Sequence, residues 1–170
     1  MEEVNSLEAF PPPFESVEKQ LRFARAVTLE TLRLYPSVPK DIKTCISSDT
    51  LPDGTWVPSG ASVVYLPYVM GRSPELWGED CCKFDPQRFI STPNPSPWKF
   101  PVFNGAGPRT CLGQRMAIVE ACFVLSSIYR DYHLELDPLE QAAPGGCPYL
   151  DSLTLPLARG VRVKVSRRVK

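Results

Sequence analysis

The sequence lacks several features that would point to large classes of protein. Its 170 residues include a single histidine and no cysteine pair with C-x-x-C spacing, which argues against most zinc and redox sites. No apolar run approaches the roughly 18 residues that a membrane-spanning helix needs. The acidic start, with no basic residue before Lys19, is unlike a signal peptide. We expect a globular chain that is soluble as given or has lost its anchor.

Net charge is also absent, because 19 basic residues balance 19 acidic ones. The chain therefore has no overall charge with which to attract nucleic acid, and we expect no nucleic-acid partner. The six cysteines could pair, but a chain this large and apolar does not need a disulfide framework, and adjacent Cys81 and Cys82 are poorly placed to bond one another. We expect five of them to be unpaired thiols, as in a reducing compartment: Cys45, Cys81, Cys82, Cys122 and Cys147.

Proline is abundant, with 19 residues, and predicts many turns and few long elements. The apolar spacing predicts a buried helix from about Glu15 to Tyr35, stopped by Pro36, and a second helix from about Leu112 to Arg130. We expect short strands at 43–47, 61–66 and 161–165, and a short helix or turn at 68–77. The proline-rich stretch at 78–111 is expected to have no regular structure. The fold class is α+β, mainly helical with small antiparallel sheets.

A glycine-rich loop at residues 105–113 places Cys111 just before the second helix and beside Arg109. This environment favours a thiolate, because free backbone N–H groups and the helix dipole stabilise negative charge there. A nucleophilic cysteine needs a general base, but His133 is expected near the surface at the far end of the helix. A lone thiolate ligand suits haem, which brings its own equatorial nitrogens. For the loop alone, a buried structural cysteine remains the alternative.

Glu30 falls inside an apolar stripe of the first helix, three residues before Arg33. A carboxylate in that position must be paired and hydrogen-bonded. We therefore expect a buried network that a second arginine completes, and Arg88 in the proline-rich stretch is the best candidate.

Three segments resemble signatures of the cytochromes P-450, the haem-thiolate monooxygenases, and they occur in that family's order. Residues 30–33 resemble its E-x-x-R helix, residues 84–89 its F-x-P-x-R-F segment, and residues 109–113 the core of its cysteine loop. The resemblance covers residues 15–170, the carboxy-terminal third of a typical member, after an extended, acidic and proline-rich start at 1–14. It implies the C-terminal part of the P-450 fold.

The resemblance implies a haem cofactor and a role for individual residues. Cys111 would be the axial ligand and catalytic thiolate, Arg109 and Lys43 would bind haem propionates, and Gly107 and Gly113 would let the backbone approach the porphyrin. Glu30, Arg33 and Arg88 would form a structural triad. The implied partners are an NADPH-dependent reductase, dioxygen and a small lipophilic substrate.

The sequence departs from the family in two ways. The family's phenylalanine stands seven residues before the cysteine, whereas here Phe103 stands eight before it, so an extra residue among Gly105 and Ala106 must bulge. Nothing in the sequence corresponds to the distal helix that delivers protons to dioxygen, so we expect the fragment to be inactive alone. A truncated, non-catalytic haem-binding or scaffold fragment is the alternative.

Substrate and docking are further expectations. The linking motifs are similar to the fatty-acid ω-hydroxylase branch, which implies a long-chain fatty acid and pocket contacts from Val38, Pro39, Tyr149 and Leu150, although these residues could equally pack against the sheet. Residues 83–115 carry five basic side chains and one acidic one, which suggests a reductase-docking face with Lys99 and Arg115 exposed. A typical eukaryotic member would lie at the cytosolic face of the endoplasmic reticulum membrane. The basic tail is expected to be the solvent face of a terminal strand: Arg162, Lys164, Arg167, Arg168 and Lys170.

Overall fold

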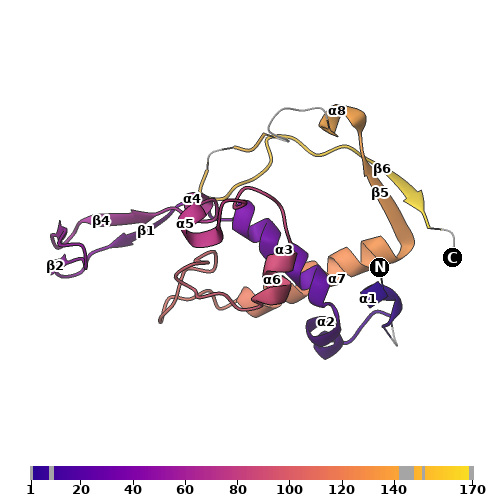
Figure 1. The fold of residues 1–170 in the computed structure, drawn as a ribbon, viewed down its shortest axis with the longest axis horizontal. Coiled ribbons are helices and arrows are strands. Elements are labelled where there is room, and N and C mark those ends of the chain that lie inside the picture. Colours follow the sequence, from indigo (N-terminus) through magenta and orange to yellow (C-terminus); the bar gives the residue numbers. More distant parts are fainter. Residues whose placement is uncertain (1, 8–9, 142–147, 151, 169–170) are drawn as a thin grey trace.

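Two long helices form the centre of the molecule. The computed structural model describes residues 2–7, 10–141, 148–150 and 152–168. In it, α3 (Arg22–Leu34) packs against α7 (Gln114–Asp131), as Figure 1 shows. The shorter helices α1 (Glu2–Asn5) and α2 (Phe14–Gln20) contact α7, and α6 (Gln87–Ser91) contacts α3. Helix α1 lies within the start that was expected to be extended.

Small antiparallel sheets flank this helical centre. Strand β1 (Asp41–Thr44) pairs with β4 (Ser62–Tyr65), and between them β2 (Asp49–Thr50) pairs with β3 (Trp56–Val57). Together they form an arm that projects from the helices in Figure 1. Strand β5 (Tyr132–Leu136) pairs with β6 (Val163–Arg167) on the other side of the molecule. The remaining helices are the short α4 (Pro67–Met70), α5 (Pro74–Trp77) and α8 (Pro138–Gln141). The α+β fold class is confirmed.

The predicted helix from Glu15 to Tyr35 is two helices, because the chain breaks at Leu21 (φ −92°, ψ 54°). Leu21 offers no side-chain cap to α3. The carboxylate of Glu3 takes that role, accepting the N–H groups of Phe23 at 2.7 Å and Ala24 at 3.3 Å. A capping acceptor at a helix N-terminus satisfies backbone donors that the helix leaves free. Helix α3 therefore depends on the side chain of Glu3, which lies in α1.

Other differences from the predicted elements are local. The proline-rich stretch is not wholly irregular, since α6 forms within it and carries Arg88. Strand β5 follows α7 directly and was not expected. It contains His133, which is exposed near the helix end as expected, with its Nε2 3.3 Å from Glu135 Oε1. The strand expected at 161–165 is shifted by two residues to Val163–Arg167. No helix in the described ranges is both long and apolar enough to cross a membrane.

The core lies between α2, α3, α6 and α7. An aromatic group anchors one end of it, with the rings of Trp77, Phe89 and Phe100 between 5.2 and 6.2 Å apart. The buried apolar set is Val17, Leu21, Ala26, Leu29, Phe89, Phe100, Ile118, Val119 and Cys122.

Helix α7 is apolar on two opposite sides. One side packs into the core, while Ala117, Val124 and Ile128, spaced seven and four residues apart, form an exposed apolar stripe on the other. An exposed apolar face of this kind marks a surface that binds something.

Candidate functional site

Arg33 is the centre of a buried hydrogen-bond network. Its side chain and that of Glu30 are both 0% exposed. The guanidinium donates twice to the Glu30 carboxylate, at 2.7 and 2.8 Å, and also to the carbonyl oxygens of Gly71, Cys81 (2.6 Å) and Lys83 (3.1 Å). Arginine has five N–H groups, and all five are used here. Arg33 therefore fixes the chain around residues 71 and 81–83 to α3.

Arg88 lies next to this pair, so the structure brings together the three residues that were expected to form a triad. Its Nε is 3.7 Å from Glu30 Oε1, and its other nitrogens donate to the carbonyl oxygens of Trp77 (3.0 Å) and Asp80 (2.9 Å). The Asp80 carboxylate lies 2.5 Å from Arg88 Nη2, and this arginine holds the pKa of Asp80 below its ordinary value. Asp80 is a member of the network that the sequence did not reveal.

The cysteine loop turns through left-handed backbone on its way to Cys111. Left-handed φ angles occur at Asn104 (72°), Gly105 (68°) and Gly107 (93°). Ala106 itself is not in the left-handed region. Only glycine adopts such angles without strain, apart from asparagine, whose short side chain tolerates them. The need for Gly107 is conformational, since a Cβ there meets nothing within 4 Å.

The Asn104 side chain ties the loop to the β1–β4 sheet. Its amide nitrogen donates to the Arg109 carbonyl oxygen, and its amide oxygen accepts from Lys43 Nζ and lies 3.1 Å from the Tyr65 hydroxyl oxygen. Lys43 also lies 3.2 Å from Asp41. The ammonium group expected at a haem propionate is therefore already engaged by protein acceptors.

Asp41 and Tyr65 shift one another's titration. The Tyr65 hydroxyl donates to Asp41 at 2.5 Å. Burial and this carboxylate together raise the pKa of Tyr65 well above its ordinary range. Burial alone would raise the pKa of Asp41, but hydrogen bonds from Tyr65, the Ile42 N–H and Lys43 outweigh it and lower the pKa.

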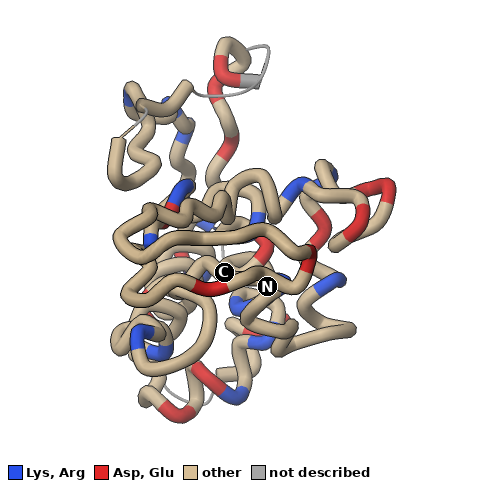
Figure 2. The backbone as a smooth tube through the Cα atoms, turned by 90° about the vertical axis from the view of Figure 1, so that its left-hand side faces the viewer, with Lys and Arg blue, Asp and Glu red and all other residues tan. Residues whose placement is uncertain are grey.

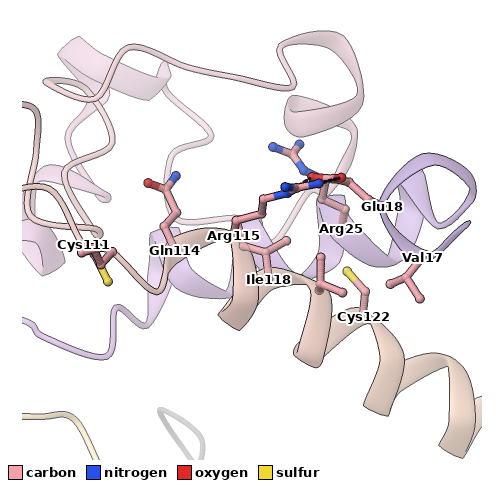
Figure 3. A pocket seen from close by; sticks show the side chains of 10 residues that line it. Val17, Glu18, Arg25, Cys111, Gln114, Arg115, Ile118 and Cys122 are labelled. Atoms are coloured by element: carbon pink, nitrogen blue, oxygen red, sulfur yellow. Dashed lines mark hydrogen bonds and ion pairs between the residues drawn. The ribbon is translucent and has the colours of Figure 1, made fainter. Parts of the chain in front are cut away.

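Cys111 lies exposed at the end of the loop, before α7 begins at Gln114. Its N–H donates to the Phe103 carbonyl oxygen at 3.0 Å, and its Sγ is 4.0 Å from where a Cβ on Gly113 would stand. Figure 3 shows the sulfur pointing away from the side chains of Gln114 and Arg115. The other described cysteines are also unpaired, as expected, while Cys147 lies outside the described residues.

The surroundings of Cys111 fit a haem. Leu112 is 94% and Met116 69% exposed, so the thiol lies beside free apolar surface. The exposed Arg109 guanidinium makes no hydrogen bond or ion pair within the described ranges, so it is free to bind a carboxylate. The described residues bring together no cluster of three His, Cys, Asp or Glu side chains. A soft single ligand, an apolar surface and a free cation match an apolar macrocycle with acidic substituents.

A hollow of about 350 Å³, which Cys111 and Leu112 help to line, lies between α2, α3 and the start of α7. On its rim Arg115 donates twice to Glu18, at 2.7 and 2.9 Å (Figure 3), and this pairing lowers the pKa of the Glu18 carboxyl.

The ammonium group of Lys99 lies 4.4 Å from the centre of the Trp77 ring. The two cations expected on a docking face are thus both engaged, and Figure 2 shows basic and acidic residues interspersed along the backbone.

The four residues expected at a substrate pocket come from two segments that the structure brings close together. The Tyr68 N–H donates to Pro39 at 3.3 Å, and its hydroxyl is hydrogen-bonded to that of Tyr149. Pro39 is buried, Val38 is half-buried, and Tyr149 and Leu150 are exposed.

The basic tail is only in part a free solvent face. Strand β6 is exposed along its length, but Arg162 lies 3.3 Å from Glu140. Arg168 donates to the carbonyl oxygens of Tyr129 (2.9 Å) and Tyr132 (3.0 Å). Lys170 lies outside the described residues.

The structure combines a buried carboxylate–arginine network with an exposed cysteine, the two features expected from the resemblance to haem-thiolate proteins. Residues 1–156 match the family model described as Cytochrome P450. The chain is 40% identical to Cytochrome P450 94B3 of Arabidopsis thaliana over an alignment of 177 residues, which covers 99% of this chain and 34% of that protein. It is also 40% identical to Cytochrome P450 704C1 of Pinus taeda, over 88% of this chain and 29% of that protein. The chain therefore belongs to the cytochrome P450 family, and it spans about a third of the length of these curated relatives.

Proposed function

We propose that residues 15–170 form the cysteine-bearing, carboxy-terminal portion of a haem monooxygenase that oxidises an organic substrate with dioxygen and reductase-delivered electrons. The observation that carries this proposal is the exposed Cys111 thiol beside apolar surface and an uncommitted Arg109. Family membership supports the class of reaction. Cys111 would be the thiolate ligand of the haem iron, and Arg109 would donate to a haem carboxylate.

Bound haem supplies the iron at which dioxygen is activated, and a thiolate ligand donates electron density that favours O–O cleavage. The chain's own contribution is to hold that ligand. Left-handed backbone at Asn104 and Gly107, together with the Asn104 side chain, fixes the loop that presents Cys111. Arg33 and Arg88 stabilise the proline-rich segment that leads to the loop.

The exposed apolar stripe of α7 supports the idea that this portion works together with further P450 sequence. Ala117, Val124 and Ile128 offer a surface that a cofactor or another helix would cover. Proton delivery to dioxygen is assigned to that further sequence, so we expect the isolated chain to bind haem without turning over substrate. The reductase would be NADPH-dependent, and the whole protein would lie at the endoplasmic reticulum membrane.

The test of haem ligation is the carbon monoxide spectrum of the purified, haem-loaded and reduced chain. Thiolate ligation predicts a strongly red-shifted Soret band. A Cys111→Ala variant should lose this band, and Cys111→His should bind haem but give an unshifted band. Cys45→Ala is the matched control and should keep it. A red-shifted band in Cys111→Ala, or no haem uptake by the wild-type chain, would refute the assignment.

For the substrate we propose a long-chain fatty acid, on the basis of the linking motifs at residues 34–39, 51–55 and 67–72. The test is to co-express the chain with the amino-terminal two thirds of a relative such as Cytochrome P450 94B3 and to supply NADPH, a P450 reductase and dodecanoic acid. We expect hydroxylated dodecanoic acid that depends on Cys111. Haem uptake without any turnover would favour a non-catalytic haem-binding protein, and turnover of dodecane but not of the acid would contradict the fatty-acid proposal.

A further inference from the structure

Two adjacent thiols outside the cysteine loop face one another. Cys81 and Cys82 follow α5, and their Sγ atoms are 4.0 Å apart. Cys81 is 4% exposed, whereas Cys82 is exposed to solvent. Burial and the hydrogen bond between the two thiols raise the pKa of Cys81. Cys82 is therefore the thiol that a reagent reaches first.

The backbone on both sides of Cys82 is held rigidly by the buried network. Arg33 donates to the carbonyl oxygens of Cys81 at 2.6 Å and Lys83 at 3.1 Å. The Cys81 thiol also donates to the Arg72 carbonyl oxygen at 3.2 Å. A ligand that takes both sulfurs would meet a pair whose geometry is already set, which lowers the entropy cost of binding.

A direct disulfide between these residues is disfavoured by the same contacts. Adjacent Cα atoms are about 3.8 Å apart, below the roughly 4.4–6.8 Å that ordinary disulfides span. Closing the bond would require twisting the Cys81–Cys82 peptide, whose carbonyl oxygen Arg33 holds. Oxidation to a disulfide therefore works against the buried network.

A single bridging atom avoids this strain. A single atom bonded to both sulfurs at about 2.3 Å, the metal–sulfur length of zinc sites, can bridge sulfurs up to about 4.6 Å apart, and the two sulfurs here are 4.0 Å apart. No third His, Cys, Asp or Glu completes a cluster at this place in the described part of the chain, so a closed zinc site does not fit. The pair suits a soft centre that needs two thiolates and brings its own third substituent.

We propose that Cys81 and Cys82 form a two-thiolate site for a soft, thiophilic centre of the trivalent arsenical type. An organoarsenous acid carries one carbon substituent and two hydroxyls on arsenic. Two S–H bonds and two As–O bonds break, two As–S bonds form, and the two hydroxyls leave with the thiol protons as two waters. Arsenic stays trivalent, so no oxidant or reductant takes part.

The experiment treats the full chain with one equivalent of phenylarsine oxide and measures the intact mass. We expect one adduct with both thiols consumed, which 2,3-dimercaptopropanol removes and excess glutathione does not. Trypsin cleaves after Arg72 and Lys83 and releases a peptide, residues 73–83, that holds both cysteines and no other. The adduct should map to that peptide.

Single substitutions separate this site from the other thiols. Cys82→Ser changes an exposed side chain and should abolish the glutathione-resistant adduct, and Cys81→Ser should do the same. Cys45→Ser and Cys111→Ser are the controls and should retain it. An adduct that survives in Cys82→Ser, that maps outside residues 73–83 or that glutathione removes would overturn the proposal. Direct disulfide formation between Cys81 and Cys82 with glutathione disulfide would also contradict it.

Discussion

Replacing Arg33 by lysine tests the buried network while keeping the charge. Arg33 uses all five N–H groups, two on Glu30 and three on backbone carbonyl oxygens. Lysine has three donors on one nitrogen, so at least two of these acceptors lose their partner. Each buried acceptor left without a donor costs about 1–3 kcal/mol, which gives a loss of about 2–6 kcal/mol in the free energy of unfolding. Such a loss is a large fraction of the stability of a typical domain.

The assay is urea unfolding of the purified chain, followed by tryptophan fluorescence and circular dichroism. With an m value of about 2 kcal/mol per molar urea, Arg33→Lys should lower the midpoint by about 1 M or more. Arg115→Lys is the control, because Arg115 makes its ion pair with Glu18 at the surface, and its midpoint should stay close to that of the wild-type chain. If Arg33→Lys unfolds at the wild-type midpoint, the five hydrogen bonds do not stabilise the fold as argued.

Three further predictions concern stability and are checked by the same unfolding assay. Gly71→Ala places a Cβ 2.1 Å from the Arg33 carbonyl oxygen and should cost about 3 kcal/mol, whereas Gly160→Ala, with open space around it, should be neutral; equal effects would contradict the packing. Glu3→Ala removes the cap of α3 and should cost about 0.5–2 kcal/mol; no loss would mean that solvent caps the helix equally well. Burial alone would raise the pKa of Asp41, but hydrogen bonds lower it. The ionised carboxylate therefore stabilises the fold above about pH 4, and this contribution is lost as the pH falls through the lowered pKa. Asp41→Asn should therefore be less stable than the wild-type chain at pH 7 and equal to it at low pH, and a constant difference would contradict this.

The parts of the fold that local signals determine were predictable. Apolar spacing located the long helix α7, and Pro36 marked the end of α3. The break at Leu21 was not predictable, because the carboxylate that caps α3 there belongs to Glu3, on a distant part of the sequence. Strand β5 exists through its pairing with β6, which is also a non-local contact.

The residues of the candidate site were likewise predictable only where the local sequence carries a signal. A carboxylate in an apolar stripe required partners, and from this the sequence led to Glu30, Arg33 and Arg88. Backbone carbonyl acceptors, such as that of Cys81, carry no sequence signal and emerged only from the structure. Counting charge along residues 83–115 failed to reveal that Arg115 pairs with Glu18, because that acid lies in α2. The role of Cys111 as the haem ligand stays a prediction.

We have proposed that Cys111 is the sulfur ligand of a haem iron. Iron-edge X-ray absorption of the haem-loaded ferric chain tests it most directly, because the signal reports the atoms bonded to iron. We predict one sulfur neighbour in the wild-type chain and in Cys82→Ser, and none in Cys111→Ala. A coordination sphere of nitrogen and oxygen alone in the wild-type chain, or a sulfur neighbour that persists in Cys111→Ala, would rule out Cys111 as the ligand.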